Sequence, residues 1–268
     1  MVASCERRLC RVVSVTSVAL ARTIALVVLP LSMARAPSHG GLQRTPFGVG
    51  ERLEYGVSFG PLHVGSAEMS VIGVDTLDGQ PAWHAVLAIS GGIPLFHVRD
   101  SSSSWFSPGS FTSHRFVQRL REGRYHADRD FRMDPSHGVY MQDAKVDSLP
   151  SDDPMDDISM LYYVRTLPLA DGDRYELRRY FQATGNPIVI RVLRREHVTV
   201  PAGSFDAVVV EPSIATPGIF AQGGHAEVWL SADSARLLLQ LKAHVRFGSL
   251  NLFLTKITPG ATRTMDKP

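Results

Sequence analysis

The segment Arg52-Leu53-Glu54-Tyr55-Gly56-Val57-Ser58-Phe59 sets the structural class of this 268-residue chain. Apolar side chains at its odd positions alternate with polar or small residues at its even positions. A period of two residues is typical of a β-strand that buries one face and exposes the other. The segment therefore predicts a sheet with one buried face.

The same alternation recurs along the chain, between short turn sequences such as Asp78-Gly79 and Glu122-Gly123. Such turns favour hairpins, because glycine and aspartate accept the backbone angles that tight turns require. We expect about a dozen strands in one antiparallel meander. After the first, they cover residues 66–74, 83–90, 111–120, 124–133, 139–146, 175–183, 188–196, 198–200, 205–211, 226–230, 237–247 and 250–257.

One helix is expected to interrupt the strands, at residues 153–166. Asp153 would cap it, with Pro154 at the first helical position and Asp156 reaching back to the cap. Pro168 prevents the helix from continuing. The side chains that recur at helical spacing are Ile158, Leu161, Tyr162 and Arg165.

The N-terminal residues have the order of a secretory signal. Four arginines precede an apolar run at residues 24–31, which is too short to span a bilayer as a permanent helix. Ala34-Arg35-Ala36 then offers small residues at the two positions that a signal peptidase recognises. We expect residues 1–36 to be a cleaved signal peptide, 37–46 a linker, 47–258 one β-rich domain and 259–268 a flexible tail. The protein would be exported, by a Sec or a twin-arginine route, and be periplasmic or associated with the outer envelope.

Removal of this leader changes the charge and the cysteine content of the chain. The leader holds five of the 28 Lys and Arg residues and one of the 26 Asp and Glu residues, which leaves 23 basic and 25 acidic residues and a net charge of −2. A charge near zero gives no electrostatic basis for binding nucleic acid. Both Cys5 and Cys10 lie in the leader, so the processed chain would have no disulfide. Cys5 ends a lipobox-like string, but the string precedes the apolar run, which favours a soluble chain over a lipid-anchored one.

Residues that carry enzyme or metal chemistry form no recognisable motif. The ten histidines are scattered, and the sequence has no Gly-x-Ser-x-Gly motif or phosphate-binding glycine loop. The hydroxyls of residues 101–104 have no neighbouring base and fit a strand edge or a loop better than a nucleophile. Clustered carboxylates at Asp152, Asp153, Asp156 and Asp157 could bind calcium or act as an acid and a base, but helix capping already accounts for them. The sequence therefore predicts no catalytic residue, no metal site and no cofactor.

Five strings occur in order between Phe47 and Ile257. They read FGVGERLEY (47–55), VGSA (64–67), DDISMLYYVR (156–165), VTVPAGSF (198–205) and VWLSAD (228–233). Together they resemble the bacterial family called domain of unknown function 3108, over nearly the whole processed chain. After Asp233, the string SARLL (234–238) departs from the family's pattern, because it has one arginine and no proline.

This resemblance implies export and a fold, but no established activity. The implied sheet looks like that of periplasmic lipoprotein carriers, an unclosed barrel around an apolar groove. The expected fold class is therefore mainly β: a single curved antiparallel sheet, an unclosed or half-open β-barrel meander, with the helix at 153–166 packed on it. A half-open barrel with a helical lid is suited to an apolar ligand.

Three functions fit these features. The first is an exported, non-catalytic envelope protein that binds a lipid or an amphipathic small molecule between sheet and helix, with an envelope protein as a further partner. The second is a hydrolase or modifying enzyme that acts on an envelope polymer through carboxylates. The third is a structural envelope protein whose core is filled by its own side chains. The expected ligand groove is lined by Ile158, Leu161, Tyr162, Arg165 and Trp229.

Overall fold

The computed structural model describes residues 45–215, 226–245 and 248–261. They belong to one compact unit that spans Leu42–Pro268. The predicted signal peptide lies outside the described residues, as do most of the predicted linker and tail and two residues of the strand predicted at 237–247.

The described strands form a single antiparallel sheet, as predicted, and the sheet has 14 strands. Their spatial order is β8-β7-β6-β5-β4-β3-β2-β1-β14-β13-β12-β11-β10-β9, so the first and last strands of the chain are neighbours. The strands are β1 (Arg52–Phe59), β2 (Leu62–Leu77), β3 (Gln80–Ile93), β4 (Phe96–Phe106), β5 (Ser113–Glu122), β6 (Tyr125–Asp134), β7 (Val139–Gln142), β8 (Lys145–Ser148), β9 (Arg174–Leu177), β10 (Ile188–Val200), β11 (Gly203–Ser213), β12 (Ala226–Ser231), β13 (Leu238–Val245) and β14 (Gly248–Thr258).

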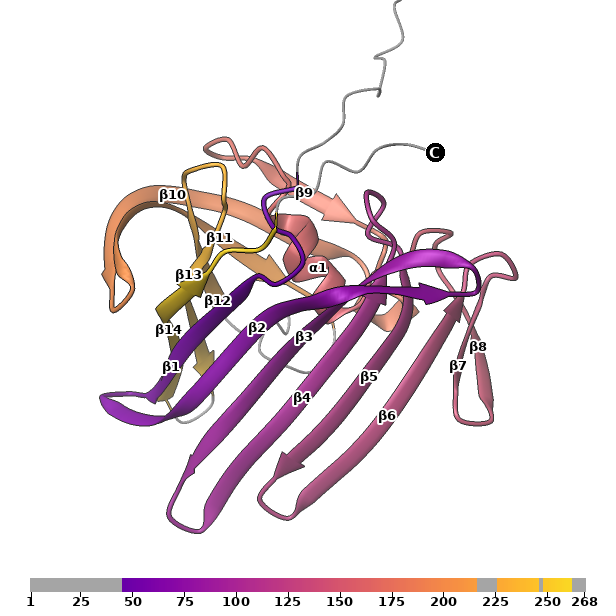
Figure 1. The fold of residues 1–268 in the computed structure, drawn as a ribbon, viewed down its shortest axis with the longest axis horizontal. Coiled ribbons are helices and arrows are strands. Elements are labelled where there is room, and N and C mark those ends of the chain that lie inside the picture. The colour runs from indigo at the N-terminus through magenta and orange to yellow at the C-terminus, as the bar shows by residue number, and fades with distance from the viewer. Residues whose placement is uncertain (1–44, 216–225, 246–247, 262–268) are drawn as a thin grey trace, which may run out of the picture. The chain divides into compact units, whose positions relative to one another are not determined.

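The sheet curves but does not close, because its two edge strands, β8 and β9, do not pair. These edges are consecutive in the chain, and the segment between them carries the helix α1 (Asp157–Val164). Figure 1 shows α1 between the two halves of the sheet, β1–β6 and β9–β14. A short 3-10 helix, η1 (Ala183–Gly185), follows β9. The half-open meander with one packed α-helix confirms the predicted fold class.

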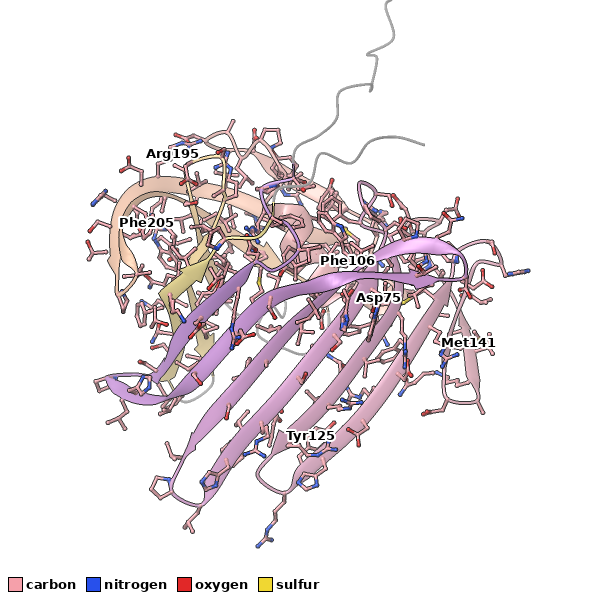
Figure 2. The ribbon with its side chains drawn as sticks, in the orientation of Figure 1. Asp75, Phe106, Tyr125, Met141, Arg195 and Phe205 are labelled. Carbon is pink, nitrogen blue, oxygen red and sulfur yellow. The ribbon has the colours of Figure 1, made fainter. Side chains whose placement is uncertain are left out.

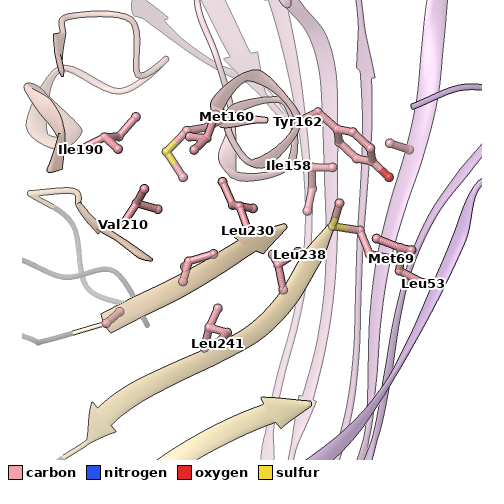
Figure 3. Close-up of a cluster of buried hydrophobic side chains, with 14 of the residues drawn as sticks. Leu53, Met69, Ile158, Met160, Tyr162, Ile190, Val210, Leu230, Leu238 and Leu241 are labelled. Carbon is pink, nitrogen blue, oxygen red and sulfur yellow. The ribbon is translucent and has the colours of Figure 1, made fainter. Parts of the chain in front are cut away.

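Side chains of α1 meet both halves of the sheet and form the centre of the core. Met160 lies near Ile190 and Val210, whereas Tyr162 points toward β1 and β2 (Figure 3). Of the eight helix residues, five are fully buried, and they include Ser159. A helix that is buried around most of its circumference gains its stability from tertiary packing rather than from helix propensity.

The helix begins three residues later than the sequence predicts, and Asp156, not Asp153, caps it. The Asp156 carboxylate accepts hydrogen bonds from the amides of Ile158 and Ser159, and the Ser159 hydroxyl accepts one from the Asp156 amide at 2.9 Å. This is a reciprocal capping box. The helix does not start at Pro154 because Met155 pairs with the chain around Tyr180. The Met155 amide donates to the Arg179 carbonyl, and the Met155 carbonyl accepts from the Phe181 amide. The helix also ends at Val164 rather than at residue 166.

Four predicted strand assignments differ from the structure. Residues 101–104 lie inside β4, bonded to β3 and β5, and not at a strand edge or in a loop. The strand predicted at 139–146 is the hairpin of β7 and β8, because Asp143 turns with a φ of 53°. The strand predicted at 175–183 ends at Leu177, and the two strands predicted at 188–196 and 198–200 are one, β10.

A buried ion pair joins α1 to the start of β1. The Arg165 guanidinium donates to both carboxylate oxygens of Glu51, at 2.6 and 2.9 Å. It also donates to the carbonyls of Ala235 and Arg236, in the turn between β12 and β13, and to that of Pro46. Burial opposes the charge of Arg165, but the hydrogen bonds and charge of Glu51 outweigh it and raise the pKa of Arg165 above its ordinary value. Two segments that are distant in sequence, residues 46–51 and 235–236, are thereby held at the end of the helix.

Removing one partner of this pair should destabilise the fold strongly. Glu51→Leu leaves the guanidinium buried without a counter-charge, and we expect it to lower the free energy of unfolding by about 3–5 kcal/mol in urea titrations. Arg165→Met should cost a similar amount, and the double variant should cost less than the sum of the two. Glu176→Leu, which breaks the exposed pair of Glu176 with Arg174, is the control and should cost less than about 1 kcal/mol. Additive costs for Glu51→Leu and Arg165→Met would contradict the coupling.

Candidate functional site

Three of the five residues expected to line a groove lie together in the packed interior. Ile158, Tyr162 and Arg165 are each at most 1% exposed, whereas Leu161 is half-buried. Phe47 packs on this group, with its ring 4.6 Å from that of Tyr162 and 4.9 Å from the Arg165 guanidinium carbon. A ligand at these three residues would have to displace side chains that already fill the space.

Trp229 lies on the opposite face of the sheet from this group. Val228 and Leu230, its neighbours in β12, lie on the face that is turned to the helix, so alternation places Trp229 on the other face. Trp229 is buried there as well, at 5% exposed. There its indole N–H donates to Glu196, and Arg194 stacks over its ring. The structure therefore does not bring Trp229 together with Ile158, Tyr162 and Arg165.

The acidic residues before and at the start of α1 have separate structural partners. The Asp156 carboxylate accepts a hydrogen bond from Ser104 at 2.5 Å in addition to its two cap bonds. Asp157 accepts one from the Tyr180 hydroxyl, and Asp153 pairs with Arg179. Burial raises the pKa of Asp156 to about 6, and hydrogen bonds from Ser104, from the Ser159 amide and from Ser113 limit the rise. Within the described residues, no three His, Cys, Asp or Glu side chains are grouped as metal ligands.

The hydroxyl of Tyr162 is an unpaired polar group of α1. It is fully buried, and it has no hydrogen-bond partner among the described residues. Burial raises its pKa far above the ordinary value for tyrosine. Figure 3 shows this hydroxyl directed toward the strands of the β1–β2 region. An unpaired buried hydroxyl costs stability, so its presence calls for an explanation.

The inner face of β3–β6 changes character with distance from α1, which packs against β3 and β4. One cross-strand row beside the helix is buried and mostly apolar: Ala85, Ser104, Phe116 and Phe131. The next row toward the hairpin tips is Leu87, Ser102, Gln118 and Arg129, all half-buried. Beyond it lie Ile89, Asp100, Leu120 and Ala127, also half-buried. This amphipathic surface, the two half-buried rows, continues the core into the part of the sheet that the helix does not cover.

The outer face of the same strands carries a basic cleft near the hairpin tips. Its volume is about 640 Å³, and it is lined by Ser90, Gly91, His97, Val98, Arg99, Arg121, Gly123 and His126. Ser90 pairs with Arg99 and Arg121 pairs with His126, and the register places Arg99 opposite Arg121. Arg121 pairs with Asp128 at 2.8 Å, whereas Arg99 has no ion pair within the described residues. Like charges directly opposite each other on neighbouring strands are unfavourable, so this cleft is suited to an anion.

The comparison with protein families agrees with the resemblance found in the sequence. Residues 54–255 match the family described as "Protein of unknown function (DUF3108)". The chain belongs to this family. Its central string, which includes Asp156, Ser159, Tyr162 and Arg165, is the capped helix and the ion pair described above. No curated protein matches the sequence of this DUF3108 chain.

Solved structures resemble this DUF3108 protein in fold. A β-barrel-like protein of domain of unknown function DUF1849 from Brucella abortus aligns with a TM-score of 0.52 at 8% identity, over 80% of this chain and 98% of that one. A "putative lipoprotein" from Parabacteroides distasonis aligns over 80% and 99% of the two chains, with a TM-score of 0.36 and 12% identity. A "putative exported protein with YmcC-like fold" from Bacteroides fragilis aligns over 80% and 97%, with a TM-score of 0.31 and 13% identity. The first shows a shared β-barrel-like fold, and the other two are too distant to support an argument.

Sequence reasoning missed both the amphipathic surface and the basic cleft. Both depend on strand β4, which was not predicted, because serine has a low strand propensity and residues 101–104 are consecutive serines. A signal was present: Val98, Asp100 and Ser102 alternate with His97, Arg99 and Ser101, and the basic residues are all on one face. Among the described residues, no helix is long and apolar enough to span a membrane.

The raised pKa of Asp156 predicts a pH dependence of stability. Between about pH 4 and pH 6 the carboxyl is protonated in the folded chain and ionised in the unfolded chain. Its favourable contribution is therefore complete below about pH 4 and is lost as the pH rises through about 6. We expect Asp156→Asn, which can still cap the helix but does not titrate, to remove this dependence. The difference in unfolding free energy between variant and wild type should change by roughly 2–3 kcal/mol across the window. Parallel pH profiles would contradict the assignment.

The unpaired hydroxyl of Tyr162 predicts that its removal is not harmful. We expect Tyr162→Phe to leave the free energy of unfolding unchanged or to raise it by about 1 kcal/mol, because no hydrogen bond is lost. Tyr55→Phe is the matched control, since the Tyr55 hydroxyl donates to the Leu238 carbonyl at 3.0 Å in the same core. It should lower the free energy by about 1 kcal/mol. Equal losses in the two variants would show that Tyr162 has a partner after all.

Proposed function

We propose that this protein is an exported, non-catalytic protein of the bacterial envelope that binds the apolar part of a lipid or other amphipathic molecule. The carrying observation is the amphipathic surface on the inner face of β3–β6. There, half-buried Leu87 and Ile89 pack against the core that surrounds α1, and half-buried Leu120 lies in the same row as Ile89. The proposal keeps the predicted class of ligand. It places the ligand on the inner face of β3–β6 rather than at the helix.

The chemistry of this surface fits an amphipathic ligand. Its apolar side chains offer contact for an acyl chain, and Ser102, Gln118 and Arg129 supply polar groups on the neighbouring strands. The Arg129 guanidinium donates a hydrogen bond to the Tyr125 hydroxyl at 2.9 Å. This bond keeps the charge of Arg129 at the border of the amphipathic surface. A half-open sheet leaves such a surface accessible, whereas a closed, filled barrel of this kind would not.

Export is the second part of the proposal. It rests on the charged N-terminal residues, the apolar run at 24–31 and the Ala34-Arg35-Ala36 sequence. Cleavage after Ala36 leaves a chain without cysteine. Two serine–histidine contacts are present, Ser107 with His114 at 2.6 Å and Ser136 with His137 at 3.1 Å. Both lie at the strand ends opposite the β3–β4 and β5–β6 turns, away from the amphipathic surface, so we do not favour the alternative of a hydrolase.

A fluorescent fatty-acid probe tests the ligand site. The variant Ile89→Ser/Leu120→Ser removes two apolar contacts from the amphipathic surface, and we expect it to weaken probe binding about tenfold. The matched control is Val86→Ser/Val117→Ser, two half-buried positions on the outer face of the same strands. The control should bind like the wild type. If the wild type binds no probe, or if both variants lose binding equally, the inner face is not the site and a purely structural role is favoured.

A further inference from the structure

Three hairpins place apolar side chains at one end of the sheet. The β1–β2, β3–β4 and β5–β6 turns lie at this end because the strands alternate in direction. The exposed apolar residues at the ends of these turns are Phe59, Leu62, Ile93, Leu95, Phe96 and Tyr125. Figure 2 shows Tyr125 at the tip and Phe106, which is buried, at the opposite end of the sheet. An exposed apolar group repeated on three neighbouring turns indicates a contact surface.

Leu95, in the β3–β4 turn, does not stabilise the fold. Pro94 and Leu95 form the two-residue turn, and Leu95 has a φ of 73° and is 100% exposed. Proline followed by a positive φ is a type II turn, in which glycine or asparagine is strongly preferred at the second position. Leucine is strained there and packs against nothing in the described chain. A strained, fully exposed apolar side chain at a turn tip is suited to insertion into an apolar medium.

The neighbouring turn holds this tip in place. The Gly123 amide donates to the His97 carbonyl at 2.8 Å, which joins the β5–β6 turn to the base of the β3–β4 turn. The ring of Phe96 lies over Gly123, so closely that a methyl group at position 123 would come within 2.8 Å of it. The β3–β4 and β5–β6 tips are therefore in direct contact with each other.

Positive charge surrounds these tips. The basic cleft presents Arg99 and Arg121 beside them, and exposed Arg124 lies in the β5–β6 turn. Asp128 pairs with Arg121, whereas Arg99 and Arg124 have no ion pair within the described residues. Asp100 and Glu122 lie on the inner face of the sheet. Apolar groups that insert, ringed by cations that face the surface, match the interface of a bilayer that contains anionic lipid.

We propose that the hairpin end of this protein docks on the surface of an anionic lipid bilayer. The turns at Phe59–Leu62, Ile93–Phe96 and Tyr125 enter the headgroup region. Arg99, Arg124 and the basic cleft contact the phosphates. In this orientation the amphipathic surface opens toward the bilayer. The docking site is separate from the proposed ligand site and does not require it.

Co-sedimentation with vesicles tests the docking site. We expect the purified protein to bind vesicles of equal parts phosphatidylglycerol and phosphatidylcholine, and to bind vesicles of phosphatidylcholine alone much more weakly. Added salt should release it. Leu95→Gly should weaken binding about fivefold while its melting temperature stays the same or rises, because glycine suits a φ of 73°. Arg99→Gln/Arg124→Gln should weaken binding about fivefold for each arginine removed.

The control removes an exposed apolar side chain elsewhere. Ile72 lies on β2 away from the hairpin end and is 56% exposed, and Ile72→Ser should bind vesicles like the wild type. Leu95→Gly should also keep the affinity for the fatty-acid probe, which separates docking from ligand binding. Failure of the wild type to bind either vesicle, or equal binding by wild type and Leu95→Gly, would overturn the proposal.

Discussion

The buried pair of Arg165 and Glu51 is the interaction on which the arrangement of this protein depends. A guanidinium in the interior must be compensated on every side, because removing it from water costs more than any single contact returns. Here the compensation comes from a bidentate carboxylate and from three backbone carbonyls. These groups come from the start of β1, the segment before it and the β12–β13 turn. The helix can therefore take only one position in the half-open sheet.

That position divides the inside of the sheet into two regions. Beside α1, the rows of side chains are buried and the cap of Asp156 is tied to Ser104 on β4. Beyond α1, the same strands carry half-buried side chains of mixed polarity. The helix thus fills one end of the inner face of the sheet, and its placement leaves the other end uncovered by the helix. This is why the residues of the family's central string are structural, while the candidate ligand site lies outside them.

The sheet could be predicted from the sequence because the signals for a strand lie within the strand itself and the turns beside it. Alternation and turn residues between Arg52 and Phe59 are enough to identify a strand and its buried face. The pair of Arg165 with Glu51 could not be predicted in this way, since 114 residues separate the partners. The predicted N-cap at Asp153 is wrong for a related reason. Asp153-Pro154 is a good local start for a helix, but the pairing of Met155 with the chain around Tyr180 prevents the helix from starting there. The sequence predicts the strand that carries Trp229, but it does not predict which face of the sheet the Trp229 side chain lies on.

The two ends of the sheet differ in the kind of departure from local rules that they carry. At the helix end, the buried atoms Tyr162 Oη, Arg236 Nη1 and His84 Nε2 have no hydrogen-bond partner among the described residues. Phe111, Leu169 and Arg236 also take a positive φ there. At the hairpin end, Leu95 takes a φ that favours glycine, Arg99 faces Arg121, and apolar side chains point into solvent. An apolar layer bordered by anions would suit the exposed apolar side chains and the facing arginines. Departures from local rules tend to gather where a protein meets its ligand or partner. The exposed apolar side chains and the facing arginines at the hairpin end therefore support the proposal that this end meets a partner surface.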